Sequence, residues 1–403
     1  MPRERSLWAG LDTGADVSRL CVVDADLISI LEETLLSDPA LIAGALAALG
    51  GKVEDIAVES ATYSIHLVRG LRDLGFRVSI FHTPQVARFL RLRRNKTDAN
   101  DASGLAELAK LRLPAIKPVH LKSPDIQRMR TKLQYRHRLL QQRLACEGMM
   151  RSMFRLEGGR LKGSQSSRQM ARNVMAEVDR LRLERGIDLR ADIAPLLELA
   201  MSIRRYLERI DKDLEDWARG NRICAMFLEI PGVGPLTAVS FYTAIEDPWR
   251  FEVATNVGAY LGLAPLVSQS GATVHHGRIS KKGSRLTRTH LVSAATVMFA
   301  GQIKDCPLKQ WGIAVAARAG KAKARVAVAR RLAVIMLAMW KSGHRYDGAL
   351  AAPRNHATLR PRESADRTEP ELIGEATTSM SSLGLPVGKV ACAGPDFATS
   401  AEA

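Results

Sequence analysis

Four carboxylates in the first quarter of the chain have the types and spacing of a metal site. Asp12 lies in GLDTG and Glu59 in AVES, while Asp98 and Asp101 lie together in KTDANDA. Clustered like charges are costly unless a cation neutralises them, and carboxylate oxygens are the ligands that Mg²⁺ (or Mn²⁺) prefers. Two bound metals suit in-line displacement at a phosphodiester. The set therefore predicts metal-assisted phosphoryl chemistry.

Each carboxylate also has an ordinary structural explanation when it is taken alone. Asp12 could cap a turn, Glu59 could pair with an arginine, and Asp98 could be the N-cap of a following helix. The metal site is favoured because all four occur together, in this order, on one pattern of strands and helices.

A serine segment in the C-terminal half is the second candidate for chemistry. Ser268 and Ser270 precede Gly271 in YLGLAPLVSQSG. A serine hydroxyl is a weak nucleophile unaided, although nearby cations and a metal can stabilise its alkoxide for attack on a phosphodiester. From residue types alone a loop of small residues is the safer interpretation, and the sequence does not choose between the two serines.

Positive charge is concentrated around this serine segment. Between Glu252 and Asp347 the sequence has fifteen Lys and Arg but a single acid, Asp305, so this stretch carries +14 of the formal net charge of +17. Such a surface fits a nucleic-acid backbone, whereas the ordinary alternative is a solvated helix face or a merely cationic protein. The predicted phosphate contacts are Arg88, Arg91, Arg93, Arg94, Lys96, Arg278, Lys281, Lys282, Arg285 and Arg288.

The elements that must position the carboxylates are predicted over residues 6–115. Strand-like and helix-like segments alternate there as βββαβαβα, which is the order of an α/β ribonuclease H-like (RuvC-like) domain with helices on both faces of its sheet. The carboxyl ends of parallel strands gather at one edge, so Asp12 and Glu59 can converge. Asp98 and Asp101 are three residues apart and share one face of a helix.

The rest of the chain is predicted to be mainly helical. Residues 120–220 have apolar residues at roughly heptad spacing, which indicates a long antiparallel hairpin or coiled coil suited to oligomerisation. Residues 222–346 form a further helical domain, in which IPGVGPLTA resembles a helix-hairpin-helix turn or an ordinary tight connection. Residues 350–403 have the composition of a disordered tail.

Composition indicates the compartment. The five cysteines are scattered without metal spacing, which is typical of reduced thiols, and neither a signal peptide nor a membrane-spanning segment is evident. We expect a cytoplasmic protein associated with the nucleoid and without a membrane partner.

Several of these segments resemble one known family. GLDTG, AVES, RNKTDANDA, IPGVGPLTA, YLGLAPLVSQSG and GRISKKGSRLTR resemble the insertion-sequence transposases of the IS110/IS116 group over roughly residues 6–345. The resemblance implies a RuvC-like DEDD domain, with Asp12, Glu59, Asp98 and Asp101 binding divalent metal, and a C-terminal transposase domain with a catalytic serine. That serine corresponds to Ser270, although Gln269 and Ala272 replace a serine and a glycine of the family pattern.

The same resemblance implies a reaction and its partners. Members of the group excise and insert mobile DNA by strand exchange between a donor and a target DNA. They are guided by a structured noncoding RNA, act as a homo-oligomer (dimer or tetramer), and form a covalent phosphoserine link. The rivals are a RuvC-like junction resolvase that uses metal-activated water, an actin-like sugar kinase or ATPase suggested by GLDTG, and a non-catalytic architectural protein.

Overall fold

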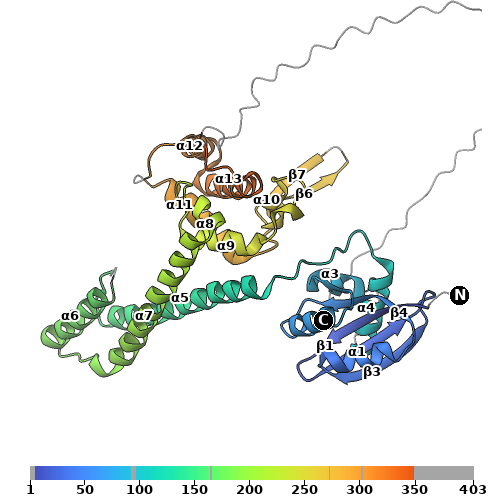
Figure 1. Ribbon diagram of the computed structural model, residues 1–403. Coiled ribbons are helices and arrows are strands. Elements are labelled where there is room, and N and C mark those ends of the chain that lie inside the picture. Colours follow the sequence, from blue (N-terminus) through green and yellow to red (C-terminus); the bar gives the residue numbers. More distant parts are fainter. Residues whose placement is uncertain (1–4, 92–96, 164–165, 272, 301–302, 349–403) are drawn as a thin grey trace, which may run out of the picture. The chain divides into compact units, whose positions relative to one another are not determined.

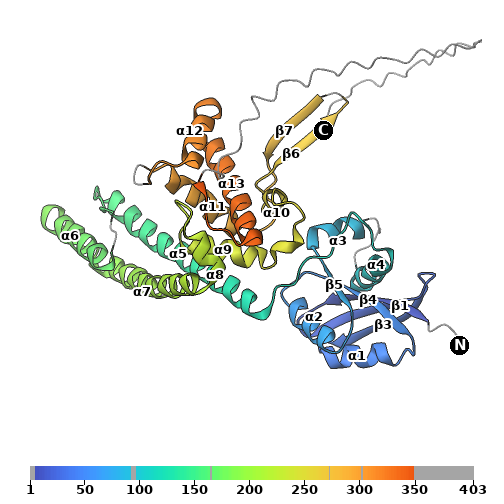
Figure 2. The same ribbon diagram turned by 45° about the horizontal axis from the view of Figure 1, so that its top comes forward.

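The computed structural model describes residues 5–91, 97–163, 166–271, 273–300 and 303–348 (Figure 1). The predicted tail at 350–403 lies outside these ranges, as do Arg93, Arg94 and Lys96. A five-stranded sheet with helices comes first in the chain, and a mainly helical region follows it (Figures 1 and 2).

The sheet is mixed, with strand order β3-β2-β1-β4-β5. β1 pairs antiparallel with β2 and parallel with β4, and β4 pairs parallel with β5. This α/β sheet confirms the order of strands and helices predicted from the sequence, while its RuvC-like class stays a prediction. The elements are β1 (Ser6–Thr13), β2 (Val17–Val23), β3 (Ser29–Leu36), α1 (Pro39–Ala47), β4 (Lys52–Glu59), α2 (Ser64–Asp73), β5 (Val78–Phe81), α3 (Thr83–Leu90) and α4 (Asp98–Leu111).

Helices cover both faces of the sheet because the central strands are apolar on both sides. Leu20 and Val22 of β2 face one way and pack in a core with α1 and α2. Cys21 and Val23 alternate with them and contact Ala102 and Ala106 of α4 on the other face. The two-residue period of a strand explains this division. The second face, which α4 covers, is the one that matters for the predicted acidic site.

A long antiparallel helix pair follows, as predicted. α5 (Pro124–Leu156) and α7 (Arg190–Gly220) are joined by ion pairs whose residue numbers rise along one helix and fall along the other. These pairs are Lys132–Asp213, Arg136–Asp211 and Arg204–Glu147. The antiparallel hairpin is confirmed, whereas supercoiling and a role in oligomerisation stay predictions.

A further helix between these two was not predicted. α6 (Ser167–Arg185) begins at the N-cap Ser166, whose side chain accepts a hydrogen bond from the Gln169 amide. Its apolar side chains share a core with Met150 and Phe154 of α5 and with Ile193 of α7. The glycine- and serine-rich segment before it therefore precedes an ordered, packed helix.

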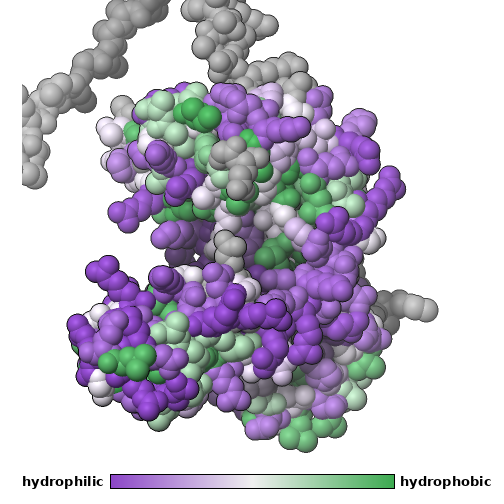
Figure 3. All heavy atoms as spheres, turned by 90° about the vertical axis from the view of Figure 1, so that its left-hand side faces the viewer, coloured by the Kyte–Doolittle hydropathy of each residue, from purple (hydrophilic) through white to green (hydrophobic). Residues whose placement is uncertain are grey.

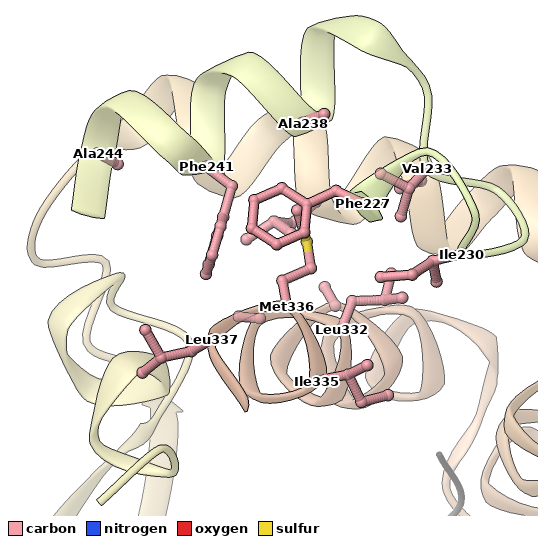
Figure 4. Packing of buried hydrophobic residues seen from close by; sticks show 14 of the residues in the cluster. Phe227, Ile230, Val233, Ala238, Phe241, Ala244, Leu332, Ile335, Met336 and Leu337 are labelled. Carbon is pink, nitrogen blue, oxygen red and sulfur yellow. The ribbon is translucent and has the colours of Figure 1, made fainter. Parts of the chain in front are cut away.

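The C-terminal region has one large core and a small sheet. Figure 4 shows Phe227, Phe241 and Met336 pointing toward one another between α9 and α13. The rings of Phe227 and Phe241 meet edge to face with their centroids 5.5 Å apart. The elements are α8 (Arg222–Phe227), α9 (Pro235–Ile245), a short 3₁₀ helix (Pro248–Arg250), α10 (Asn256–Tyr260), β6 (Pro265–Ser270), β7 (Thr273–Ile279), α11 (Arg285–Met298), α12 (Pro307–Ala319) and α13 (Lys321–Ser342).

Hydrophilic side chains predominate on the face shown in Figure 3, and apolar side chains form small, separate patches there. Within the described ranges, no helix combines the length and the apolar character needed to cross a membrane.

Candidate active site

Asp12 and Glu59 lie side by side at the carboxyl ends of two neighbouring parallel strands. Leu11 of β1 pairs with Val58 of β4, so the next residue on each strand is one of the two acids. Neighbouring strands are about 5 Å apart. Both side chains are half-buried. The convergence that the strand pattern predicted is therefore present in the sheet.

Both acids also belong to the face of the sheet that α4 covers. Asp12 is two residues after Gly10, whose missing Cβ would point directly at the backbone of α4. Glu59 is two residues after Ala57, which packs with Leu105 of α4. Because side chains at i and i+2 of a strand share a face, Asp12 and Glu59 point to the side where α4 lies.

The other two acids are in the first turn of α4. Thr97 is the N-cap, and its hydroxyl accepts a hydrogen bond from the Asn100 amide. Asp98 therefore does not serve as the N-cap, which removes one of the structural explanations considered for it. Acids in the first helical turn are also favoured by the positive end of the helix dipole. Asp98 is exposed and Asp101 is half-buried.

A cavity of about 420 Å³ joins two of these elements. Asp12 and Asp98 both line it, together with Arg19. Arg19 of β2 lies opposite Asp12 of β1 in the strand register. The Arg19 guanidinium donates to the Thr34 hydroxyl at 2.8 Å and lies 3.6 Å from the Glu32 carboxylate. The structure thus brings Asp12 and Asp98 to one cavity, while Glu59 and Asp101 are not part of its lining.

The four acids have the chemistry of divalent-metal ligands. All are hard oxygen donors, and they come from two strand ends and one helix start on a shared face of the sheet. Among the residues that the structure describes, however, no three acids, histidines or cysteines are close enough to form a complete cation site. The four acids therefore share one face of the sheet without forming a closed cluster.

The predicted serine lies at the tip of a two-stranded hairpin, not in a loop. Ser270 is the last residue of β6 and pairs with Thr273 of β7, and Ser268 pairs with His275. Gly271 follows with a φ of +58°, a conformation that favours glycine in a tight hairpin turn. Both serines are exposed, and they share one face of the hairpin because they are two residues apart.

Basic residues lie around the base of this hairpin. Arg278 is on β7, Lys281 and Lys282 are in the turn that follows, and Arg285 opens α11; all four are exposed. Ser284 is the N-cap of α11, so the positive end of the helix dipole adds to these charges. The turn and the helix start together present a strongly cationic surface.

Arg288 differs from these four. Its Nη1 donates to the carbonyl oxygens of Leu261 and Lys282, at 3.0 and 2.6 Å, and burial lowers the pKa of its guanidinium. The side chain therefore fastens the basic turn to the end of α10. Its predicted contact with phosphate stays a prediction, whereas its structural role follows from these hydrogen bonds.

The glycine turn between α8 and α9 is tightly packed. Gly232 has a φ of +84°, and a Cβ there would lie 2.8 Å from the Ala294 carbonyl oxygen of α11. Both constraints require glycine, which supports a tight structural connection. Binding of phosphate at this turn stays a prediction.

A cluster that sequence reasoning missed ties the segment before α5 to the end of α9. Lys122 is buried, and its ammonium donates to the carbonyl oxygens of Ala244 and Ile245, both at 2.9 Å. His120 lies 2.6 Å from the Glu246 carboxylate. Burial lowers the pKa of Lys122 to about 7, against the opposing effect of Glu246. Nothing in the local sequence of these residues would have revealed the contact.

Two regions of the chain match families of known proteins. Residues 224–306 match the family described as Transposase IS116/IS110/IS902 family, and residues 9–156 match a second family, the DEDD transposases of IS110, described as Transposase. Both regions are therefore regions of transposases. The chain therefore carries transposase domains of the IS110/IS116/IS902 family.

Individual relatives support this assignment along most of the chain. The transposase for insertion sequence element IS1111A of Coxiella burnetii is 26% identical over 82% of this chain and 88% of its own length. A putative transposase of Sinorhizobium fredii, y4pF/y4sB, is 28% identical over 72% of this chain and 74% of its own length. The pilin gene-inverting protein of Moraxella bovis is 28% identical over 32% of this chain and 39% of its own length.

Proposed function

We propose that this transposase cuts and rejoins DNA strands with Ser270 as its nucleophile. The observation that carries the proposal is the exposure of Ser270 at the tip of the β6–β7 hairpin, a hairpin that has four exposed cations at its base. A nucleophile for a phosphodiester must reach a bulky, highly charged substrate. An exposed hydroxyl on a hairpin with a cationic base meets that requirement.

In the proposed chemistry, each phosphate ester bond that breaks is replaced by a new one, so the energy of the phosphodiester is conserved. The Ser270 oxygen forms a bond to phosphorus as the bond to one DNA hydroxyl oxygen breaks, and that hydroxyl leaves with a proton. A free hydroxyl of the second DNA then attacks the phosphoserine, and the serine oxygen leaves and regains its proton. Excision and integration follow from two such exchanges between a donor and a target DNA.

Asp12, Glu59, Asp98 and Asp101 are the residues that would hold Mg²⁺ (or Mn²⁺) in this proposal. A bound divalent metal would supply Lewis-acid stabilisation of the charge that develops on the phosphate oxygens. The shared face of Asp12 and Glu59, and the cavity lined by Asp12 and Asp98, support this assignment.

Arg278, Lys281, Lys282 and Arg285 would contact the phosphates of the bound strand, with Arg288 holding their turn in place. Arg88 and Arg91 are exposed at the end of α3 and would do the same near the acids. The further contacts assigned to Arg93, Arg94 and Lys96 lie outside the described residues. Phosphate contacts position a nucleic acid without reading its sequence.

Two parts of the proposal concern partners. A structured noncoding RNA would supply sequence recognition by base pairing, which fits a protein whose cations are arranged to hold backbones. A dimer or tetramer would form along the helical hairpin, where Leu144, Met149 and Leu156 of α5 are exposed.

The decisive experiment traps the covalent link. The full chain is incubated with Mg²⁺, DNA carrying the ends of its element and RNA from the adjacent noncoding region, and DNA-linked protein is sought on a denaturing gel. We expect a shifted band for the wild type and for Ser268→Ala, and none for Ser270→Ala or Asp12→Asn. Cleavage without a link that survives in Ser270→Ala would overturn the serine mechanism and leave a nuclease that uses water.

A further inference from the structure

A groove of about 970 Å³ lies between the β6–β7 hairpin and helices α12 and α13. Its walls are largely apolar, with Leu263, Ile279, Trp311 and Val326 among the lining residues. Trp311 is half-buried, so part of its ring is open to the groove. A volume of this size is in the range of sites that enclose small molecules or single units of a polymer.

The charged residues in the lining are all cations. They are Arg278, Lys281, Lys323, Arg330 and Arg331, with no aspartate or glutamate among the described residues that line the groove. An apolar wall with an aromatic ring and a cationic rim suits an occupant that is flat and apolar on one side and anionic on the other. A nucleotide has this combination, because its base stacks on aromatic side chains while its phosphate is drawn to cations.

The groove is continuous with the hairpin that carries Ser270. His275 lines the groove and is the cross-strand partner of Ser268, so its side chain is on the same face of the hairpin as both serines. Ser270 is two residues beyond Ser268, which is about 7 Å along a strand. A DNA strand whose phosphate lies at Ser270 would therefore reach the groove within a few nucleotides.

We propose that this groove, between the hairpin and α13, holds an unpaired nucleotide of the DNA strand that Ser270 cuts. The inference rests on the proposed function, because it takes the strand at Ser270 to be DNA. A base within a duplex is stacked on both faces and paired at its edge, so it must leave the duplex to lie against Trp311. Strand exchange requires such local unpairing beside the cut.

The first test measures binding of single-stranded DNA to the full chain carrying Ser270→Ala, so that cleavage plays no part. A short fluorescent oligothymidylate is titrated by anisotropy. Ala322→Trp, which places an indole in the groove from the exposed start of α13, should weaken binding roughly tenfold, the scale of one lost stacking contact. Ala317→Trp on α12, exposed and outside the groove lining, is the matched control and should bind like its parent.

The cations that line the groove are tested by the salt dependence of binding to the same single-stranded DNA. Lys323→Ala should lower the slope of log affinity against log salt by about 0.7, the value expected for one lost phosphate contact on a single strand. Arg325→Ala is exposed on the same helix but outside the groove lining, and it should leave the slope unchanged. Melting temperatures of all variants establish that they are folded.

A cross-link locates the base directly. Iodouracil is placed at successive positions beside the cut in element-end DNA, and we expect one position to cross-link to the peptide that contains Trp311. Cross-links confined to other peptides, or unchanged affinity of Ala322→Trp, would overturn the inference. Preferred binding of oligouridylate would assign the groove to RNA instead. A change in oligomeric mass without a change in DNA affinity would assign it to a second copy of the chain.

The failure of this inference can be told apart from the failure of the proposed function. Absence of a covalent link in the wild type would overturn the serine chemistry, whatever the oligonucleotide assays show. A wild type that forms the link while the groove variants bind DNA normally would overturn the groove assignment alone.

Discussion

Gly10 of β1 and Ala102 of α4 lie so close that a Cβ on Gly10 would be 2.0 Å from the Ala102 carbonyl oxygen. The helix therefore rests directly on the strand. Asp12 is two residues from Gly10, and Asp101 is the neighbour of Ala102. The separation between strand and helix consequently sets how near the acids of β1 and α4 can come to each other.

Gly10→Ala should disrupt this packing. The new methyl group would meet backbone atoms that cannot rotate away, so we expect a loss of several kcal/mol of stability in the sheet region. Thermal unfolding followed by circular dichroism measures it. Gly44→Ala on α1 is the control, because no atom lies within 4 Å of its added Cβ. That control should be neutral or stabilising by about 0.5 to 1 kcal/mol, and an equal loss in both variants would contradict the role of the close approach.

Divalent metal should stabilise the chain through the four acids. A ligand that binds only the folded state raises stability by about 2.7 kcal/mol at one hundred times its dissociation constant. We therefore expect Mg²⁺ or Mn²⁺ to raise the melting temperature, and a chelator to reverse the rise. Asp12→Asn and Asp98→Asn should abolish the effect, whereas Asp26→Asn, exposed before β3, should keep it. An undiminished rise in Asp12→Asn would contradict the assignment.

The sequence was most informative where its residues are constrained by local structure. The order of strand-like and helix-like segments predicted a sheet covered by helices on both faces, and the ends of its parallel strands predicted where Asp12 and Glu59 would converge. The helix after Thr97 was also predicted. Its cap could not be assigned, because Thr97 and Asp98 are both good N-cap residues, and only the geometry shows that Thr97 accepts the hydrogen bond.

The sequence was least informative for two elements, and for different reasons. α6 was obscured by the glycines and serines before it, although Met170, Val174, Val178 and Leu181 have the spacing of one helix face. The β6–β7 hairpin was obscured because β6 is exposed along its whole length and so lacks a buried face. Its two-residue turn at Gly271 was the available indication. The groove beside it joins residues far apart in sequence, which no local pattern could reveal.

Removal of Glu147 should strongly destabilise the helical hairpin. This buried carboxylate lies 2.7 Å from the Arg204 guanidinium of α7 and also contacts Arg143 and Arg151. Glu147→Ala would leave Arg204 buried without its partner, a change that costs about 3 to 5 kcal/mol. Urea unfolding measures the loss. Glu215→Ala, which breaks an exposed pair on α7, is the control and should cost less than about 1 kcal/mol. Equal losses of stability in Glu147→Ala and Glu215→Ala would contradict the distinction between a buried and an exposed ion pair.

His290 should make stability depend on pH below neutrality. Burial, followed by Arg136 and His137, lowers the pKa of its imidazole to about 4, and its Nδ1 has no hydrogen-bond partner among the described residues. The unfolded chain would bind a proton near pH 6.5, whereas the folded chain would not until about pH 4. Stability is therefore full above pH 6.5 and falls between these values, by at most about 3 kcal/mol. His290→Phe should reduce this dependence. If the melting temperatures of the wild type and of His290→Phe change in parallel from pH 4 to 7, the prediction is contradicted.

Arg285 and Arg288 lie one turn apart on α11, yet their substitutions should have different effects. Arg285 is exposed, so Arg285→Ala should lower the salt slope of duplex DNA binding by about 0.9, the value for one phosphate, without changing the melting temperature. The Arg288 guanidinium donates to the carbonyl oxygens of Leu261 and Lys282, so Arg288→Ala should lower the melting temperature as well, because those acceptors lose their partner. Affinity measured at several salt concentrations, with calorimetry of each variant, separates the two effects. A normal melting temperature for Arg288→Ala would show that the basic turn keeps its shape without this arginine, and would contradict its structural role.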